Sequence, residues 1–270
     1  MKDGGLLSIS ELAKLSRISR TALIYYDRIG LVTPVMRGEN NYRYYSHRQI
    51  ASTNLVNTLQ SLGMPLREIA DLMRLRTPRE MLGLMSRQEE RIDGEIGRLG
   101  RSKKLIEALR KMVEHGVAAG EDAIEARVEE EEPIFLGPRV NYAGGKTASE
   151  AILEFYEYCE RRDPDMDMHY PVCGFFSEAN VRRLERRGPD RFYFWMPDAP
   201  DRKPEGLYAT GYARGYYGQS GGLFLRIMRY MEENGLEICG PAWEMYPLNE
   251  ISVAHCDDYL IKISISAKRA

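Results

Sequence analysis

The chain has 270 residues and a formal net charge of −2, so it is long enough for two domains. No apolar stretch approaches the roughly 20 residues that span a bilayer, and residues 1–10 lack the apolar core of a secretion signal, which excludes a membrane protein and predicts a cytoplasmic chain. Residues 1–116 hold 20 Lys and Arg against 13 Asp and Glu, whereas residues 117–270 hold 18 against 27. The basic first part is therefore the part expected to meet phosphates.

The cysteines argue against a metal centre. Cys159, Cys173, Cys239 and Cys256 lie far apart and form no CxxC or CxxH pair. We therefore expect reduced, mostly buried thiols, with no disulfide framework, no bound metal and no cofactor.

Residues 9–30 predict two short amphipathic helices joined by a tight turn. Ser10 is the expected N-cap of the first helix, and Ser19 that of the second. The second helix presents Arg20, Thr21 and Tyr25 on its outer face. A helix with this outer face can lie in the major groove of DNA, where Arg donates to guanine and the other side chains meet methyl groups and phosphates.

A basic hairpin and two further helices follow. Residues 35–36 and 42–45 predict strands around the turn at 37–41, and Arg67 projects from the start of the second following helix. Singly, each of these side chains is explained equally well by a solvated surface or a core aromatic, but their order along the chain favours contact with double-stranded DNA. The predicted DNA-binding residues are Arg17, Ser19, Arg20, Thr21, Tyr25, Tyr26, Arg37, Tyr42, Arg43 and Arg67.

Three segments of this region resemble the head of the MerR family of transcription regulators. They are TALIYYDRIGLVTP, YRYYS and LGMPLREIADLM, and the similarity runs from Ile9 to about Met73. Ile24 departs from the pattern, because the family usually has Arg before the paired tyrosines. The resemblance implies a winged helix-turn-helix homodimer on a near-palindromic promoter, with an over-long spacer between the two hexamers that RNA polymerase recognises.

A long helix is predicted from Thr77 to Gly116. Apolar residues recur every seven positions on it, at Met85, Ile92, Leu99, Ile106 and Val113. This repeat predicts a dimerisation helix, and the resemblance to the MerR family implies that two such helices form an antiparallel coiled coil. The alternative is a helix whose apolar stripe packs against its own domain.

The remaining chain predicts a linker and a further domain. The expected division is a winged helix-turn-helix domain at 1–76, a dimerisation helix at 77–116, a linker at 117–132 and a ligand-binding domain at 133–270. Strand-like and helical stretches alternate twice in the last part, which predicts an α+β domain within a mixed α/β, multidomain chain. From about Arg127 to Ala270 the order resembles the effector-binding domain shared by the GyrI-like family and BmrR-type MerR regulators.

Glu244 is the candidate centre of a ligand site, because it lies on a strand that is otherwise apolar or aromatic. A carboxylate among aromatic rings attracts a lipophilic cation. In BmrR-type proteins the acid at this place belongs to the drug site, and Tyr170 and Tyr259 match pocket tyrosines. The predicted ligand-binding residues are Tyr142, Tyr170, Phe175, Tyr193, Trp195, Tyr208, Glu244, Tyr246 and Tyr259.

Lys262 leaves two alternatives open. Glu244 could be a structural acid paired with Lys262 or with an arginine, or Lys262 could lie near the cavity and offset the charge of Glu244. The second case would leave neutral or zwitterionic ligands open.

The expected function is a ligand-responsive, DNA-binding transcription regulator, an activator that distorts a long-spacer promoter when a lipophilic small molecule binds. Multidrug sensing is expected. No convincing catalytic constellation is found, so the chain is not expected to be an enzyme. The alternatives are a metal- or redox-responsive regulator of the same family and a ligand-hydrolysing activity in the second domain.

Overall fold

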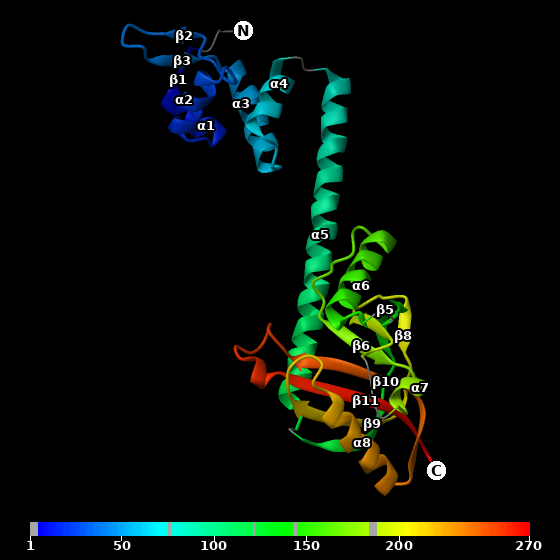
Figure 1. Cartoon of the computed structure of the whole chain (residues 1–270). Helices are drawn as coiled ribbons and strands as arrows, with labels where there is room; N and C mark the ends of the chain where they lie inside the picture. Colours follow the sequence, from blue (N-terminus) through cyan, green and yellow to red (C-terminus); the bar gives the residue numbers. More distant parts are fainter. Residues whose placement is uncertain (1–4, 75–76, 121, 143–144, 184–187) are drawn as a thin grey trace. The chain divides into compact units, whose positions relative to one another are not determined.

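The computed structural model describes residues 5–74, 77–120, 122–142, 145–183 and 188–270. It divides into two compact units, Met1–Gly97 and Arg98–Ala270, which are described separately (Figure 1). Both helices and strands are present, which confirms the expected mixed α/β, multidomain class. No helix in the described ranges is long and apolar enough to cross a membrane.

The first unit is a small helical domain with a three-stranded antiparallel sheet of order β1-β3-β2. Its core joins the helices and two of the three strands around fully buried side chains such as Leu12, Leu23 and Tyr45, whereas the residues of the third strand, Met36 and Arg37, are exposed. Its elements are β1 (Leu7–Ser8), α1 (Ile9–Ser16), α2 (Arg20–Arg28), β2 (Met36–Arg37), β3 (Arg43–Tyr45), α3 (Arg48–Ser61), α4 (Leu66–Arg74) and the first half of α5 (Pro78–Ala118).

Capping explains where the first two helices begin. Ser19 caps α2 by accepting a hydrogen bond from the Ala22 amide, as the sequence predicts. The prediction of Ser10 as the cap of α1 is wrong, because Ser8 forms a capping box with Glu11 and the helix begins at Ile9. The strand β1 ends where this box starts, so the sheet and the first helix are joined without a loop.

The helix α5 carries two kinds of apolar residue. Leu84 packs into the core of the first unit and Met112 into a core of the second, and both are buried. The residues of the seven-residue repeat are less buried than Leu84 and Met112. Four of them and the flanking Ile96 are exposed. Their exposed fractions are Met85 44%, Ile92 40%, Ile96 62%, Leu99 53% and Ile106 64%.

The second unit is built on an eight-stranded antiparallel sheet of order β4-β9-β11-β10-β6-β7-β5-β8. Four helices accompany this sheet in the described ranges: α6 (Ala148–Arg162), α7 (Glu178–Val181), α8 (Gly221–Glu233) and the last part of α5. Its strands are β4 (Ile124–Glu129), β5 (Glu132–Arg139), β6 (Val172–Phe176), β7 (Arg191–Trp195), β8 (Asp201–Lys203), β9 (Gly206–Arg214), β10 (Leu236–Leu248) and β11 (Leu260–Arg269).

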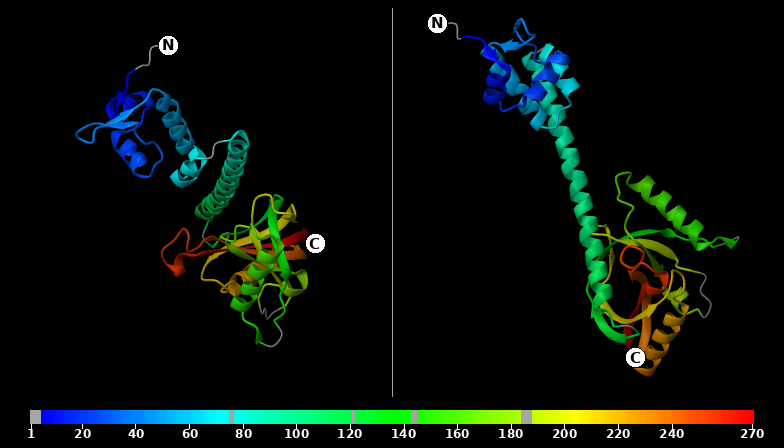
Figure 2. Two further views of the ribbon diagram at one scale, coloured as in Figure 1. Left: turned by 90° about the horizontal axis from the view of Figure 1, so that it is seen from above. Right: turned by 90° about the vertical axis from the view of Figure 1, so that its left-hand side faces the viewer.

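The two faces of this sheet are covered by different helices. Phe155 of α6 packs on Phe192 and Phe194 of β7, and Ile227 of α8 packs in one cluster with Ile263 of β11. The other face holds Trp243 and Met245 of β10, together with Met112 of α5. The last turns of α5 thus lie on one side of the sheet and α6 and α8 on the other (Figure 2, right).

The predicted linker at 117–132 is corrected by the fold. Residues 124–129 form the edge strand β4, which pairs with β9 over its whole length, and β5 begins at Glu132. A linker was expected because this segment is rich in charged residues. On β4 these residues alternate with apolar ones such as Ile124 and Val128. Residue 76, where the first predicted domain ends, and residue 121 of the predicted linker lie outside the described residues.

Candidate functional sites

The N-terminal half of α2 presents a polar face to solvent. Arg20 and Thr21 follow the Ser19 cap, and Tyr25 lies one turn later with 46% of its surface exposed. Arg17 stands in the turn before this helix in a left-handed conformation, with a φ of 55°. Because the first amides of a helix have no partner within it, this end also favours an approaching phosphate.

Tyr26 and Ile24 lie behind this face. The prediction that Tyr26 contacts DNA is corrected, since only 3% of the side chain is exposed and its hydroxyl donates to the Gln60 side chain of α3. Ile24 packs against the core of the unit. The family usually has Arg at this position. The apolar Ile24 is accommodated here because its side chain packs against the core.

The hairpin β2–β3 is fastened to α2 by one carboxylate. The Asp27 side chain is only 4% exposed and accepts hydrogen bonds from Arg37 Nη2 at 2.7 Å and from Arg43 Nε at 2.6 Å. These two predicted DNA-binding arginines therefore fix the hairpin against the helix, while Tyr42, beside the turn of the hairpin, remains exposed. Arg43 is the more enclosed of the two, with 23% of its side chain exposed against 43% for Arg37.

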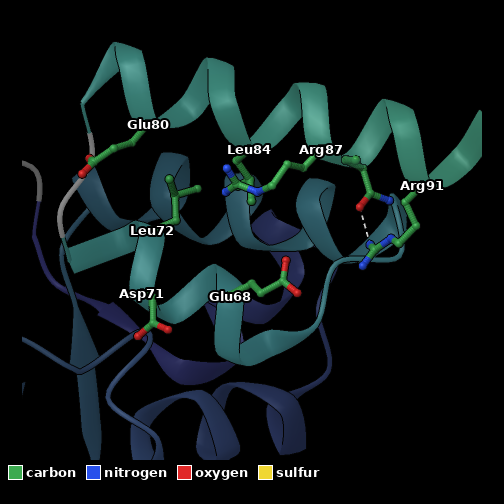
Figure 3. Close-up of a pocket in the computed structure, with 8 residues that line it drawn as sticks. Glu68, Asp71, Leu72, Glu80, Leu84, Arg87 and Arg91 are labelled. Atoms are coloured by element: carbon green, nitrogen blue, oxygen red, sulfur yellow. Dashed lines mark hydrogen bonds between the residues drawn. The ribbon is translucent and has the colours of Figure 1, made fainter.

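A cavity of about 580 Å³ lies between α4 and α5 within the first unit (Figure 3). Acids of α4 face arginines of α5 across it, and it is lined by Glu68, Asp71, Leu72, Glu80, Leu84, Arg87, Gln88 and Arg91. Beside the cavity, Gln88 donates to the Leu62 carbonyl and Arg91 donates to the Gly63 carbonyl at 2.9 Å. These bonds tie the α3–α4 turn to α5. Arg67, also predicted to contact DNA, is exposed at the start of α4.

Lys262 belongs to a charged cluster on the face of the second sheet that Met112 covers. Its Nζ lies 3.1 Å from Glu129 of β4, whose carboxylate also pairs with Lys203 and accepts hydrogen bonds from Thr210 and Ser264. Burial raises the pKa of Glu129, but the charges of Lys262 and Lys203 outweigh burial and hold that pKa far below its usual range. The acid is fully satisfied and ionised.

Glu244 lies on the opposite face of the same sheet. It pairs in register with Ile263 of β11 and with Gly174 of β6, and Gly174 pairs with Phe192. Because opposed residues share a face, Glu244 points to the side that α6 and α8 cover, and Lys262 points away from it. Both alternatives for Lys262 are therefore corrected, since it neither pairs with Glu244 nor offsets its charge.

The Glu244 carboxylate is buried and only half satisfied. Oε1 accepts a hydrogen bond of 2.6 Å from the Tyr246 hydroxyl, whereas Oε2 has no hydrogen-bond partner among the described residues. Burial raises the pKa of Glu244, while the nearby hydroxyls of Ser220 and Tyr246 lower it less strongly. An unfilled buried acceptor is unusual in a native fold and indicates a place for a further polar or charged group.

The predicted aromatic set does not surround one site. Phe175 and Tyr193 pair with Trp243 and Cys173 and lie on the face away from Glu244, together with Trp195 and Tyr208. These four are corrected as ligand contacts of Glu244. On the Glu244 face lie Tyr246, Tyr142 with its hydroxyl on the Pro189 carbonyl at 3.1 Å, and Tyr170 in the α6 core. Burial, Asp190 and Glu244 raise the pKa of Tyr142 to about 12.

Tyr217 and Glu250 were not in the predicted set, although both are connected to Glu244 through Tyr246. The ring of Tyr217 lies 4.4 Å from that of Tyr246 and 5.6 Å from that of Tyr259, measured between centroids. Its hydroxyl donates to Glu250 Oε2 at 2.6 Å. Tyr216 and Tyr217 are adjacent in the sequence. Their position beside β10 could not be predicted from it, because that position depends on the loop before α8.

The far end of β10 touches α5. A Cβ atom on Gly116 would lie 2.7 Å from Leu248 Cγ and Cδ2, so only glycine permits this approach. Asn249 is 2% exposed and donates to the Tyr246 carbonyl at 3.2 Å, and the same amide lies 4.0 Å from the sulfur of Met112. The strand that carries Glu244 and Tyr246 thus ends in direct contact with the last turns of α5.

The thiols are partly as expected. Cys159 and Cys173 are buried, but Cys239 and Cys256 are exposed, so the expectation of mostly buried thiols holds for half of them. Within the described ranges no three His, Cys, Asp or Glu side chains come together in an arrangement that could hold a metal ion.

Comparison with known proteins gives the following similarities. Residues 7–75 match the family model described as MerR HTH family regulatory protein. The chain is 29% identical to the multidrug-efflux transporter 2 regulator of Bacillus subtilis (strain 168), over 96% of this chain and 95% of that protein. It is 30% identical to the multidrug-efflux transporter 1 regulator of the same organism, over 48% and 50% of the two chains. The solved structure of the EcmrR–DNA complex in EcmrR-RPo is 15% identical, covers 98% of this chain and 100% of that chain, and has a TM-score of 0.43.

Proposed function

We propose that the chain, whose residues 7–75 match the family model described as MerR HTH family regulatory protein, is a DNA-binding regulator of this family that activates transcription when a lipophilic cation binds beside Glu244. The observation that carries the ligand-dependent part is the buried Glu244 carboxylate with an unfilled oxygen among tyrosines. Similarity over 96% of the chain to a multidrug-efflux transporter regulator supports multidrug sensing.

Promoter DNA is the proposed partner of the first unit. The exposed start of α2 enters the major groove with Arg20 and Thr21, and the hairpin tip flanks it. Asp27 keeps the hairpin at a fixed angle to α2 through Arg37 and Arg43. The edges of both arginines that Asp27 leaves exposed supply positive charge to the phosphates.

A homodimer is proposed through α5. Four large apolar side chains of its seven-residue repeat and the flanking Ile96 remain 40–64% exposed, although Leu84 and Met112 of the same helix are buried in cores. This division argues against the alternative in which the stripe packs against its own domain. Pairing with a second copy as an antiparallel coiled coil would remove the stripe from water and bring two heads to one near-palindromic site.

Ligand binding would reach the head through β10 and α5. A cation at the free Oε2 of Glu244 draws the carboxylate toward itself, and with it the Tyr246 hydroxyl that donates to Oε1. The Tyr246 carbonyl in turn accepts a hydrogen bond from Asn249 beside Met112. Movement of this strand end acts on Gly116. The two heads then bend and untwist the promoter so that RNA polymerase engages both hexamers.

The test is transcription in vitro from a long-spacer promoter with purified RNA polymerase, with and without a lipophilic quaternary ammonium cation. We expect output to rise with the cation for the wild-type chain and to stay low for Glu244→Gln. Equal output under all conditions would remove the activator function.

DNA recognition is measured separately by fluorescence anisotropy with the same promoter. Arg20→Ala is expected to weaken binding by about 1–3 kcal/mol, as for loss of one base-edge contact. Arg110→Ala is the matched control, because this exposed arginine of α5 carries the same charge and lies in the second unit. Equal losses for both variants would mean that only net charge matters.

A further inference from the structure

A second acid adjoins the Glu244 site. Glu250 follows β10 by two residues, is exposed, and accepts a hydrogen bond from the Tyr217 hydroxyl at 2.6 Å. Tyr217 and Tyr246 stand ring to ring at 4.4 Å, and the Tyr246 hydroxyl donates to Glu244. The structure therefore contains two Tyr–Glu pairs side by side, one with a buried acid and one with an exposed acid.

Aromatic residues from two parts of the second unit lie beside Glu250. Tyr217 precedes α8 and donates its hydroxyl to Glu250, and Tyr259 precedes β11 with its ring 5.6 Å from that of Tyr217. These rings offer faces to an apolar body and partial negative charge to a cation.

The charge of this region is not balanced by a base. In the described part of the chain no Lys, Arg or His forms an ion pair with Glu244 or Glu250, and Lys262 lies on the other face of the sheet. When both carboxyls are ionised, a single cation leaves one negative charge without a partner. Two cationic groups would neutralise the pair.

We propose that this site is selective for dications, with one positive group bound at Glu244 and the second at Glu250, and an apolar body across Tyr217 and Tyr246. The inference rests on the proposed cation-responsive function and names the ligand class of that site. The buried acid with its unfilled oxygen provides the main anchor. The exposed acid discriminates between ligands that carry one charge and those that carry two.

The outer contact is expected to be the weaker one. An ion pair with an exposed carboxylate contributes little in water, although aromatic faces beside it add to the attraction. We therefore expect a preference of about five- to tenfold for a dication over its singly charged half.

Binding of two matched probes to the full-length protein, measured by calorimetry, tests this. The probes are a bis-quaternary ammonium compound with an aromatic ring at each end of an alkyl chain and the mono-quaternary compound with the same ring and half the chain. Glu250→Gln should reduce the preference to about twofold or less and leave the affinity for the monocation unchanged. Glu205→Gln, which removes an exposed acid between β8 and β9, should retain the preference.

The possible outcomes distinguish a failure of dication selectivity from a failure of the proposed cation site itself. If the wild type shows no preference, or if Glu250→Gln weakens both probes equally, dication selectivity is wrong even though cation sensing stands. If Glu244→Gln leaves both affinities unchanged, the proposed cation site itself is wrong, and the selectivity falls with it. Tyr217→Phe keeps the ring and frees Glu250, so it should preserve or increase the preference.

Discussion

Each face of the sheet in the second unit holds a buried carboxylate, and the two carboxylates have very different hydrogen-bond and charge partners. On the face that Met112 covers, Glu129 is surrounded by Lys203, Lys262 and two hydroxyl groups, and its pKa is held far below the usual range. On the face that α6 and α8 cover, Glu244 has one tyrosine hydroxyl and an unfilled oxygen, and burial raises its pKa. Both acids lie in the same sheet, so the difference comes from the side chains around each of them.

This difference distinguishes a structural acid, Glu129, from the proposed binding acid, Glu244. A buried charge is tolerated when partners neutralise it and satisfy its oxygens, and breaking such a network leaves uncompensated charge. A buried acid without these partners destabilises its own ionised form and gains most when a ligand brings positive charge. We therefore expect Glu129 to control stability and Glu244 to control binding.

The largest expected effect is on stability, from Glu129→Ala. The change leaves Lys262 buried without its carboxylate and removes one partner of Lys203, so the free energy of unfolding should fall by about 3–5 kcal/mol in urea titrations. Glu125→Ala is the matched control, because Glu125 lies on the same strand and face but is 56% exposed. The control should change stability by less than about 1 kcal/mol. A similar small change for Glu129→Ala would break the comparison.

A smaller effect is expected where β10, the strand that carries Glu244, meets α5. Gly116→Ala places a methyl group 2.7 Å from Leu248 and should destabilise the chain by about 1–3 kcal/mol, because the strand end and the helix must separate. Gly94→Ala on the same helix meets nothing within 4 Å and should stabilise by up to about 1 kcal/mol through helix propensity. Thermal unfolding of both variants checks this. Equal shifts would show that Leu248 moves aside at no cost.

The smallest expected effect is the pH dependence of Glu244. Its folded pKa is raised, so the folded state holds the proton more tightly, and stability is lost as pH rises from about 4.5 through the raised value. Glu244→Gln should remove this loss, about 1.4 kcal/mol for each pH unit of pKa shift. Cation affinity should change in the opposite direction and fall as pH falls through the same window. Parallel pH profiles for wild type and Glu244→Gln would contradict the assignment.

Local patterns predicted several elements well. One of the helical stretches expected in the second domain is α6, Ala148–Arg162, which begins where Thr147 and Glu150 form a capping box. Ser19 caps α2 as expected, and the long helix differs from its predicted span by one or two residues at each end. Caps and heptads act within a few turns of chain, which is why sequence alone is sufficient for them.

The candidate ligand site was predicted only in part. Glu244 was identified as an acid on an apolar strand, but its predicted companions Phe175, Tyr193, Trp195 and Tyr208 lie on the wrong face of the sheet. A strand's face is set by its register with neighbours far away in sequence, and one position of shift reverses it. Glu250 and Tyr217 were missed for a related reason, since a turn and a loop bring them together.

The sequence by itself predicted a DNA-reading head, a long helix with an apolar repeat and an acid as the candidate centre of a ligand site, because each prediction rests on spacing within one segment. Only the tertiary structure decided which acid is satisfied. The pairing of β4 with β9 and of β9 with β11 brings Glu129 to Lys262, and the same register turns Glu244 away from that lysine. Sheet register is decided by contacts between distant segments, and it therefore separated the structural carboxylate from the binding one.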